Sequence, residues 1–120
     1  MRVMKLDSLK STAEFDFIYR NARRFFHKSF VFYALYPQDF SFLSFRAKQI
    51  LSIIRSRGAS MYLGLSISRK IGKAHIRNLC KRRLKAIIRE NVLDKNAYQD
   101  SIFVIVPREG IITSDLYLIK

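Results

Sequence analysis

The chain has 120 residues, enough for one domain with a single modest hydrophobic core. Its 23 lysines and arginines against 9 acidic residues give a formal charge of +14, which favours a polyanionic partner: nucleic acid first, an anionic membrane surface second. Because 49% of the residues are hydrophobic, the composition excludes a disordered basic tail.

Cysteine content and hydropathy exclude further classes of protein. Cys80 is the only cysteine, which excludes an intramolecular disulfide and a cysteine-based zinc cluster. The first residues lack the apolar run of a signal peptide, and no stretch approaches the roughly 20 apolar residues that cross a membrane. We therefore expect one domain over residues 1–120, in a reducing cytoplasm.

The first predicted element is a helix that begins after Ser11 and ends near Asn21. Ser11 and Glu14 have the spacing of a capping box. One face of this helix carries Phe15, Ile18 and Tyr19.

Three β-branched and aromatic runs predict strands, at residues 29–37, 61–67 and 101–107. In the second run we expect the odd-numbered residues to face a core, while Gly64 and Ser66 leave the opposite face open. Residues 38–59 mix an apolar beginning with a basic end. We expect them to form an inserted, partly ordered basic loop that can be helical near residues 46–55.

A second helix is predicted from about residue 74 to 91, because apolar residues recur there with helical period. Its apolar arc consists of Ile76, Cys80, Leu84, Ile87 and Ile88. We expect Cys80 to be a core residue rather than a reactive thiol. Thr113 or Ser114 can cap a final short helix. The order of elements predicts an α/β (α+β) two-layer sandwich, with helices packed on a mixed sheet of about four strands.

Few residues are suited to catalysis. His27 and His75 stand alone in basic stretches, where surface donors are commoner than catalysts. The nine carboxylates contain no close group of three or four, which disfavours a two-metal nuclease site. We expect no catalytic and no metal-binding residue in this protein.

The positive charge is concentrated and unbalanced. From Phe40 to Arg89 there are thirteen basic residues and no acid, so the intrahelical partners of an ordinary solvated helix are missing. Phosphate binding is the favoured use, since lysine supplies a point charge and arginine a bidentate fork. Composition alone does not separate RNA from DNA, and a merely solvated charged face remains the alternative.

The order of residues is more specific than their charge. The stretch GLSISRKIGKAHIRNLCKRRLK, with Gly72 after a basic turn, then Arg77 and Asn78, then Lys81 and Arg82, resembles the signature of the bacterial ribonuclease P protein subunit. That family reads as a GLSVSKK-type strand and turn, an IG or VG, and an RNR-type motif followed by KR. The first helix and the FVFYAL and IFVIVPREG strands extend the resemblance over most of the chain, apart from about residues 38–59.

The resemblance implies a basic cofactor protein for a large catalytic RNA that removes the 5′ leader from precursor tRNA. In that family the RNA carries the chemistry with bound Mg²⁺, the protein helps engage the leader, and the fold has a left-handed βαβ crossover. The predicted contacts with the catalytic RNA are Arg69, Lys70, Lys73, Arg77, Asn78, Lys81, Arg82, Arg83, Lys85 and Arg89. The predicted leader site is an aromatic cleft of Phe15, Tyr19 and Tyr33, whose alternative is plain core packing.

Three features depart from the family pattern: the basic segment at 38–59, a short last helix, and Leu79 in place of the third residue of the RNR-type run. We hypothesise that Leu79 has joined the core margin and that Arg83, one turn later, supplies the missing charge. Arg83 as a solvated extra charge is the alternative.

Two other functions remain open. A structural RNA-binding protein of ribosomal type shares the charge and the lack of catalytic groups. A basic helix on a membrane surface is disfavoured, because the flanking strands need that helix to cover them.

Overall fold

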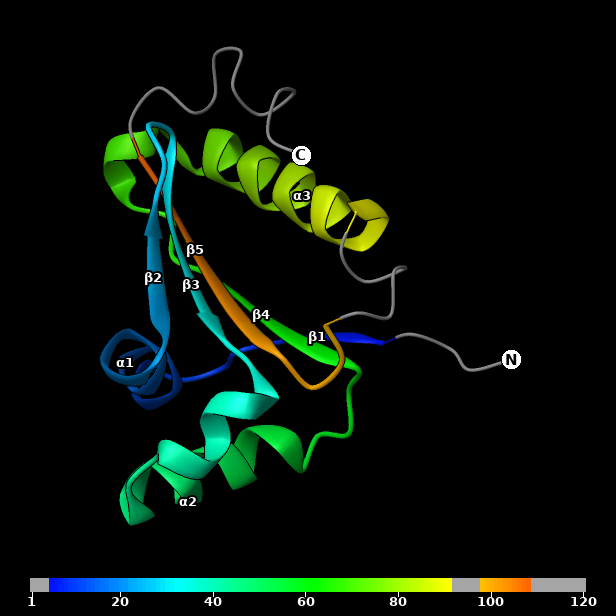
Figure 1. Ribbon diagram of the computed structural model, residues 1–120. Coiled ribbons are helices and arrows are strands. Elements are labelled where there is room, and N and C mark those ends of the chain that lie inside the picture. The colour runs from blue at the N-terminus through cyan, green and yellow to red at the C-terminus, as the bar shows by residue number, and fades with distance from the viewer. Residues whose placement is uncertain (1–4, 92–97, 109–120) are drawn as a thin grey trace.

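A computed structural model describes residues 5–91, without the side chain of residue 91, and residues 98–108 (Figure 1). Its strands are β1 (Leu6–Ser8), β2 (Arg23–Phe26), β3 (Phe30–Leu35), β4 (Met61–Leu65) and β5 (Ile102–Pro107). Its α-helices are α1 (Thr12–Asn21), α2 (Phe45–Arg55) and α3 (Ala74–Asn91), with 3₁₀ turns at Pro37–Phe42 and Arg69–Ile71. The predicted final helix lies outside the described residues.

The strands form one mixed sheet in the order β1-β4-β5-β3-β2. β4 pairs in parallel with β1 and β5, and β3 pairs antiparallel with β5 and β2. The α+β class and the mixed sheet are therefore as predicted. Among the described residues the sheet has five strands rather than about four, because the short segments β1 and β2 also pair.

Helices lie on both faces of the sheet, as Figure 1 shows. Helices α1 and α2 cover one face, here called the α1 face, where Phe17, Leu51 and Tyr62 belong to one buried cluster. Helix α3 covers the other, the α3 face, where Cys80 and Leu84 pack with Phe103. The sheet is therefore packed against a separate core on each face, so the molecule has three layers rather than the predicted two, and the central strands are buried from both sides.

The alternation of side chains along β3 and β4 assigns each residue to a face, and Met61, Leu63 and Leu65 of β4 face the core on the α3 side as predicted. Phe30, Phe32 and Ala34 pack on the α3 side, whereas Tyr33 and Leu35 pack on the α1 side. The parallel strands β4 and β5 are joined through α3, the crossover whose left-handedness the family resemblance implies.

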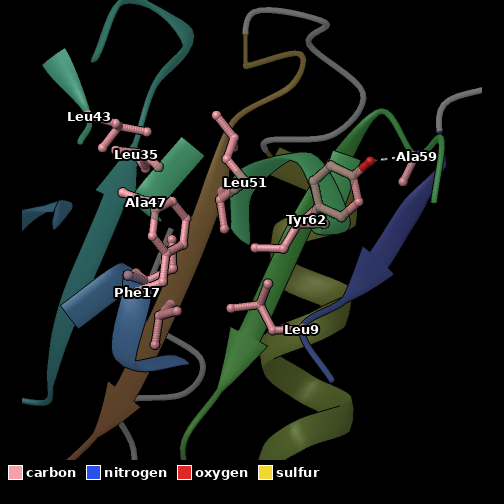
Figure 2. Close-up of a cluster of buried hydrophobic side chains, with 12 residues drawn as sticks. Leu9, Phe17, Leu35, Leu43, Ala47, Leu51, Ala59 and Tyr62 are labelled. Carbon is pink, nitrogen blue, oxygen red and sulfur yellow. Dashed lines mark hydrogen bonds between the residues drawn. The ribbon is translucent and has the colours of Figure 1, made fainter. Parts of the chain in front are cut away.

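Residues 38–59 are ordered rather than a partly ordered loop, and the helix that the sequence allowed near residues 46–55 is present as α2. Ser44 begins α2, with its side chain accepting a hydrogen bond from the N–H of Ala47 at 3.2 Å. The helix then buries Ala47, Leu51 and Ile54 in the α1-face core (Figure 2). The reason is a helical apolar period in this segment, which the interspersed basic residues and exposed phenylalanines conceal.

Tyr62 joins the end of α2 to the sheet. Its ring is buried in the α1-face core, and its hydroxyl accepts a hydrogen bond from the N–H of Ala59 at 3.1 Å (Figure 2). The same hydroxyl donates to the carbonyl of Arg55 at 3.3 Å. A buried phenol with both bonds satisfied fixes this connection.

Candidate RNA interface

Helix α3 presents its charge on one side. Cys80, Leu84 and Ile88 are buried against the sheet, and burial raises the pKa of the Cys80 thiol. The predicted core role of Cys80 is thus confirmed. Lys73, Asn78, Lys81, Arg82 and Arg89 are exposed, and Arg77, Arg83 and Lys85 are half-buried. No ion pair between described residues involves Lys81, Arg82 or Lys85. The positive charges of Lys81, Arg82 and Lys85 are therefore available to bind the phosphates of a nucleic acid.

The basic turn before α3 has a fixed shape. Ser68 accepts a hydrogen bond from the N–H of Lys70 at 3.1 Å, while Arg69 and Lys70 are exposed. Gly72 has φ +152°, and a Cβ there would lie 3.0 Å from Cγ2 of Ile76. The guanidinium of Arg77 donates to the carbonyl of Gly72 at 2.8 Å. Arg77 therefore orders the turn, a role that its place in a basic motif did not reveal.

Leu79 and Arg83 are both half-buried, next to the buried stripe of α3. Their placement agrees with the geometry that the compensation hypothesis requires. Whether Arg83 binds RNA stays a prediction.

The three aromatic residues predicted to bind the leader lie together on the α1 face. Tyr19 lies 4.9 Å from Tyr33 and 6.3 Å from Phe15, measured between ring centroids. Phe15 and Tyr33 pack partly against the core, whereas Tyr19 is 37% exposed. An open groove of about 380 Å³ runs beside Phe15 and Tyr19 and is also lined by Lys10, Ser11, Thr12, Asp16, Leu65 and Ser66.

Gly64 brings α1 close to the sheet. A Cβ at this position would lie 2.7 Å from Cε1 of Phe15 and 2.9 Å from Cδ1 of Leu9. The face that we expected Gly64 to leave open is therefore covered by Phe15. The missing side chain is what seats Phe15 in the wall of the groove.

The basic helix and the aromatic groove meet at the outer edge of β4. A second hollow, of about 220 Å³, is lined by Lys81 and Lys85 of α3 together with Phe15, Ser8, Leu9, Leu63 and Leu65. Strand β1 ends at Ser8. The two predicted sites are thus parts of one continuous surface, which the sequence alone did not indicate.

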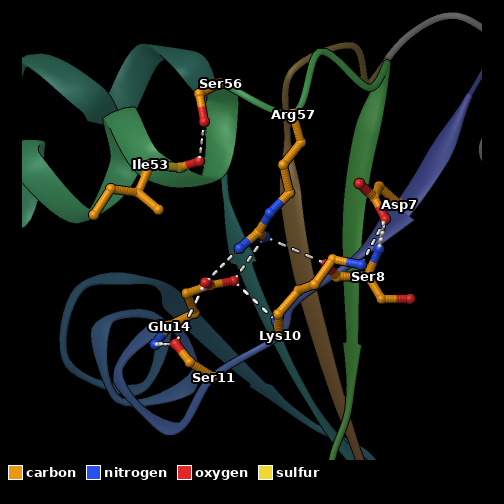
Figure 3. A network of polar contacts seen from close by, with 8 residues as sticks. All are labelled: Asp7, Ser8, Lys10, Ser11, Glu14, Ile53, Ser56 and Arg57. Carbon is orange, nitrogen blue, oxygen red and sulfur yellow. Dashed lines mark hydrogen bonds and ion pairs between the residues drawn. The ribbon is translucent and has the colours of Figure 1, made fainter.

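A polar network holds α1 in place (Figure 3). Ser11 accepts from the N–H of Glu14 at 3.3 Å, as the capping-box spacing predicted, and the Glu14 carboxylate accepts from the N–H of Lys10 at 2.9 Å. Arg57 donates two hydrogen bonds to that carboxylate, which holds the pKa of Glu14 below its usual value. Arg57 was counted among the basic residues, but its pairing with Glu14 carries no signal in the sequence.

The described residues contain no group of three or more histidine, cysteine or acidic side chains that could hold a metal ion. None of the described helices is long and apolar enough to span a membrane.

Comparison with known proteins assigns the family. The ribonuclease P family model matches residues 3–118. The ribonuclease P protein component of Helicobacter hepaticus is 52% identical over 97% of this chain and 78% of the relative. That of Helicobacter pylori strain J99 is 32% identical over 95% of this chain and 70% of its own.

Solved structures share the fold. The RNase P protein of Staphylococcus aureus has a TM-score of 0.66 and 19% identity, covering 92% of this chain and 83% of its own. That of Thermotoga maritima has a TM-score of 0.61 and 21% identity, covering 90% and 79%. The chain therefore belongs to the ribonuclease P protein family, whose members named here are protein components of that enzyme.

Proposed function

We propose that this protein binds the catalytic RNA of ribonuclease P and the 5′ leader of precursor tRNA, and so promotes removal of the leader. The observation that carries the proposal is the junction at the β4 edge, where Lys81 and Lys85 of the basic helix share a hollow with Phe15 of the aromatic groove. An RNA bound along α3 and a second strand bound in the groove would then lie side by side.

The catalytic RNA is the proposed partner of α3 and the preceding turn. Six exposed basic side chains would neutralise phosphates of this RNA, and each neutralised phosphate releases counterions. These residues are Arg69, Lys70, Lys73, Lys81, Arg82 and Arg89. The buried residues Cys80, Leu84 and Ile88 pack α3 against the sheet. Arg77 contributes by ordering the turn through Gly72 as well as by its charge.

The single-stranded leader is the proposed occupant of the groove. Unpaired bases stack on aromatic rings with about 1–3 kcal/mol each, with little regard to sequence. Of the three rings, Tyr19 is the most exposed; it makes an edge-on contact with Tyr33 at 4.9 Å and lies 6.3 Å from Phe15.

Bond cleavage is assigned to the RNA in this proposal. Mg²⁺ bound by the RNA subunit would supply the attacking hydroxide. The protein's share is to bind, to orient the leader and to screen phosphate repulsion between the two RNAs.

A substitution at Tyr19 tests the leader site. In complex with the catalytic RNA, Tyr19→Ala should weaken binding of precursor tRNA about tenfold and leave binding of mature tRNA unchanged, because only the precursor carries a leader. Tyr98→Ala is the matched control, since Tyr98 is 38% exposed but packs against Phe103 on the α3 face. Equal losses for precursor and mature tRNA would contradict leader recognition by Tyr19.

A further inference from the structure

Strand β2 is an exposed edge strand with an unusual surface. All four of its residues are exposed, and Phe26 is 69% exposed. Phe25, its neighbour, packs beside Phe32 at 6.1 Å between centroids and so contributes to the α3 face. Phe26 has no ring contact of that kind among the described residues. A large exposed aromatic surface at a sheet edge favours aggregation, so such a surface often marks a binding site.

The register of the hairpin places Phe26 on the same face as the groove. Arg24 stands opposite Tyr33, and Phe26 stands opposite Val31. Side chains two residues apart on a strand share a face, so Phe26 lies diagonally beyond Tyr33, at about 7–8 Å. The sequence of rings Phe15, Tyr19, Tyr33 therefore continues to Phe26 at the open edge of the sheet.

Arg24 lies between Tyr33 and the exposed ring of Phe26. Its guanidinium carbon lies 4.8 Å from the centre of the Phe26 ring, while its backbone pairs with Tyr33. An arginine over an aromatic ring offers a flat cation on which a base can stack, and it also attracts phosphate. The hairpin segment from Arg23 to Lys28 contains no acidic residue. Arg23 is paired with Asp39 of the 3₁₀ turn at 2.7 Å, while Arg24 and Lys28 form no ion pair among the described residues. Its charge thus complements a nucleic acid.

We propose that Arg24 and Phe26 form a distal subsite that stacks a base of the 5′ leader farther from the cleavage point than the base at Tyr19. This proposal rests on the leader-binding function proposed above. Stacking needs a ring face that solvent reaches, and Phe26 is more exposed than Phe15, Tyr19 or Tyr33. A leader that crosses the sheet from Phe15 to the β2 edge runs over Tyr33 and Arg24 before it reaches Phe26.

The test is a series of precursor tRNAs with leaders of increasing length, bound to the complex of the protein with catalytic RNA. For wild-type protein, affinity should rise with leader length and then level off. Phe26→Ala should match wild type for the shortest leaders and bind the longest ones about fivefold or more weakly, the loss of one stacked base. Phe26→Trp should restore the affinity for long leaders.

Two controls make the result specific. Phe42→Ala removes a phenylalanine that is 87% exposed in the 3₁₀ turn before α2, outside strands β2 and β3, and should have no effect at any leader length. Arg24→Gln should reproduce part of the Phe26→Ala loss and lower the salt dependence for long leaders only. Thermal unfolding of each variant verifies folding.

The possible outcomes distinguish failure of the distal subsite from failure of the proposed leader binding. If wild-type affinity grows with leader length and Phe26→Ala follows the same curve at every length, the distal subsite is wrong. The proposed leader binding is then still supported. A uniform loss that includes mature tRNA also overturns it, because Phe26 then serves general affinity or folding. No length dependence for wild type overturns both.

Discussion

Glu14 and Arg57 form a bidentate ion pair that ties helix α1 to the segment after α2. The two N–O distances are 2.8 and 2.6 Å, and the side chains are only 6% and 19% exposed. Glu14 also accepts the N–H of Lys10. Since α1 carries Phe15 and Tyr19, this pair sets the position of the groove wall relative to the sheet.

Removing Arg57 should be costly. Arg57→Met leaves a buried carboxylate without its cation, and we expect a loss of about 3 kcal/mol in the free energy of unfolding, measured by chemical denaturation. The double variant Glu14→Gln/Arg57→Met should lose less, because no uncompensated charge remains. The single variant Glu14→Gln completes the cycle. If the double variant loses as much free energy of unfolding as the two single variants together, Glu14 and Arg57 are not coupled.

The same pair predicts acid sensitivity. Hydrogen bonds from Arg57 are the main cause of the lowered pKa of Glu14, so the folded pKa lies below the unfolded value near 4.5. Its stabilisation is fully present above that value and is lost as pH falls through the folded pKa. Denaturation at graded pH should show this fall in wild type and a smaller fall in Arg57→Met. Identical pH profiles would contradict the assignment.

Gly64 should be intolerant of any side chain. In Gly64→Ala the new methyl group would meet Phe15 and Leu9 at under 3 Å, so α1 must shift or Phe15 must leave its place. We expect a destabilisation of about 1–3 kcal/mol. We also expect weaker binding of precursor tRNA in the complex with catalytic RNA. Gly58→Ala is the comparison: nothing lies within 4 Å of a Cβ at that position, but its φ of +71° carries a backbone cost. It should therefore affect stability alone.

Arg82 should make one phosphate contact. Arg82→Ala is expected to weaken binding of the catalytic RNA and to reduce the slope of log affinity against log salt by about one unit. Arg46→Ala, an exposed arginine on α2 across the sheet from α3, is the matched control and should leave the slope unchanged. A folded Arg82→Ala protein with the wild-type slope would remove Arg82 from the interface.

Leu79 and Arg83 provide a test of compensation. If Arg83 supplies the charge that the family motif has at position 79, Arg83→Leu should bind the catalytic RNA more weakly, and adding Leu79→Arg should restore much of the affinity. Filter binding over a range of salt measures both effects. Wild-type affinity and salt dependence for Arg83→Leu would end the compensation hypothesis.

The sequence predicted the elements whose pattern is set by burial. Helix α1, the three long strands and α3 follow the apolar period, and Cys80 falls in the core as its place on α3 required. Strand β2 was missed because an edge strand with four exposed residues shows no alternation, and β1 because three residues are too few for a pattern.

The remaining differences have a common cause. In residues 38–59 the apolar period of Leu43, Ala47, Leu51 and Ile54 was present in the sequence, but exposed Phe42 and Phe45 obscured it. The junction of Lys81 and Lys85 with Phe15, and the ion pair of Glu14 with Arg57, join residues far apart in the chain. A local pattern carries no information about such contacts, which depend on the register and order of the strands.

The proposed function is tested by measuring cleavage of precursor tRNA by the catalytic RNA with and without this protein. The substrate is followed at decreasing Mg²⁺ concentration. We expect the protein to sustain removal of the 5′ leader, at the correct position, at Mg²⁺ concentrations where the RNA alone is nearly inactive. Tight binding to the RNA with no stimulation of cleavage at any Mg²⁺ concentration would contradict it and would indicate a purely structural RNA-binding protein.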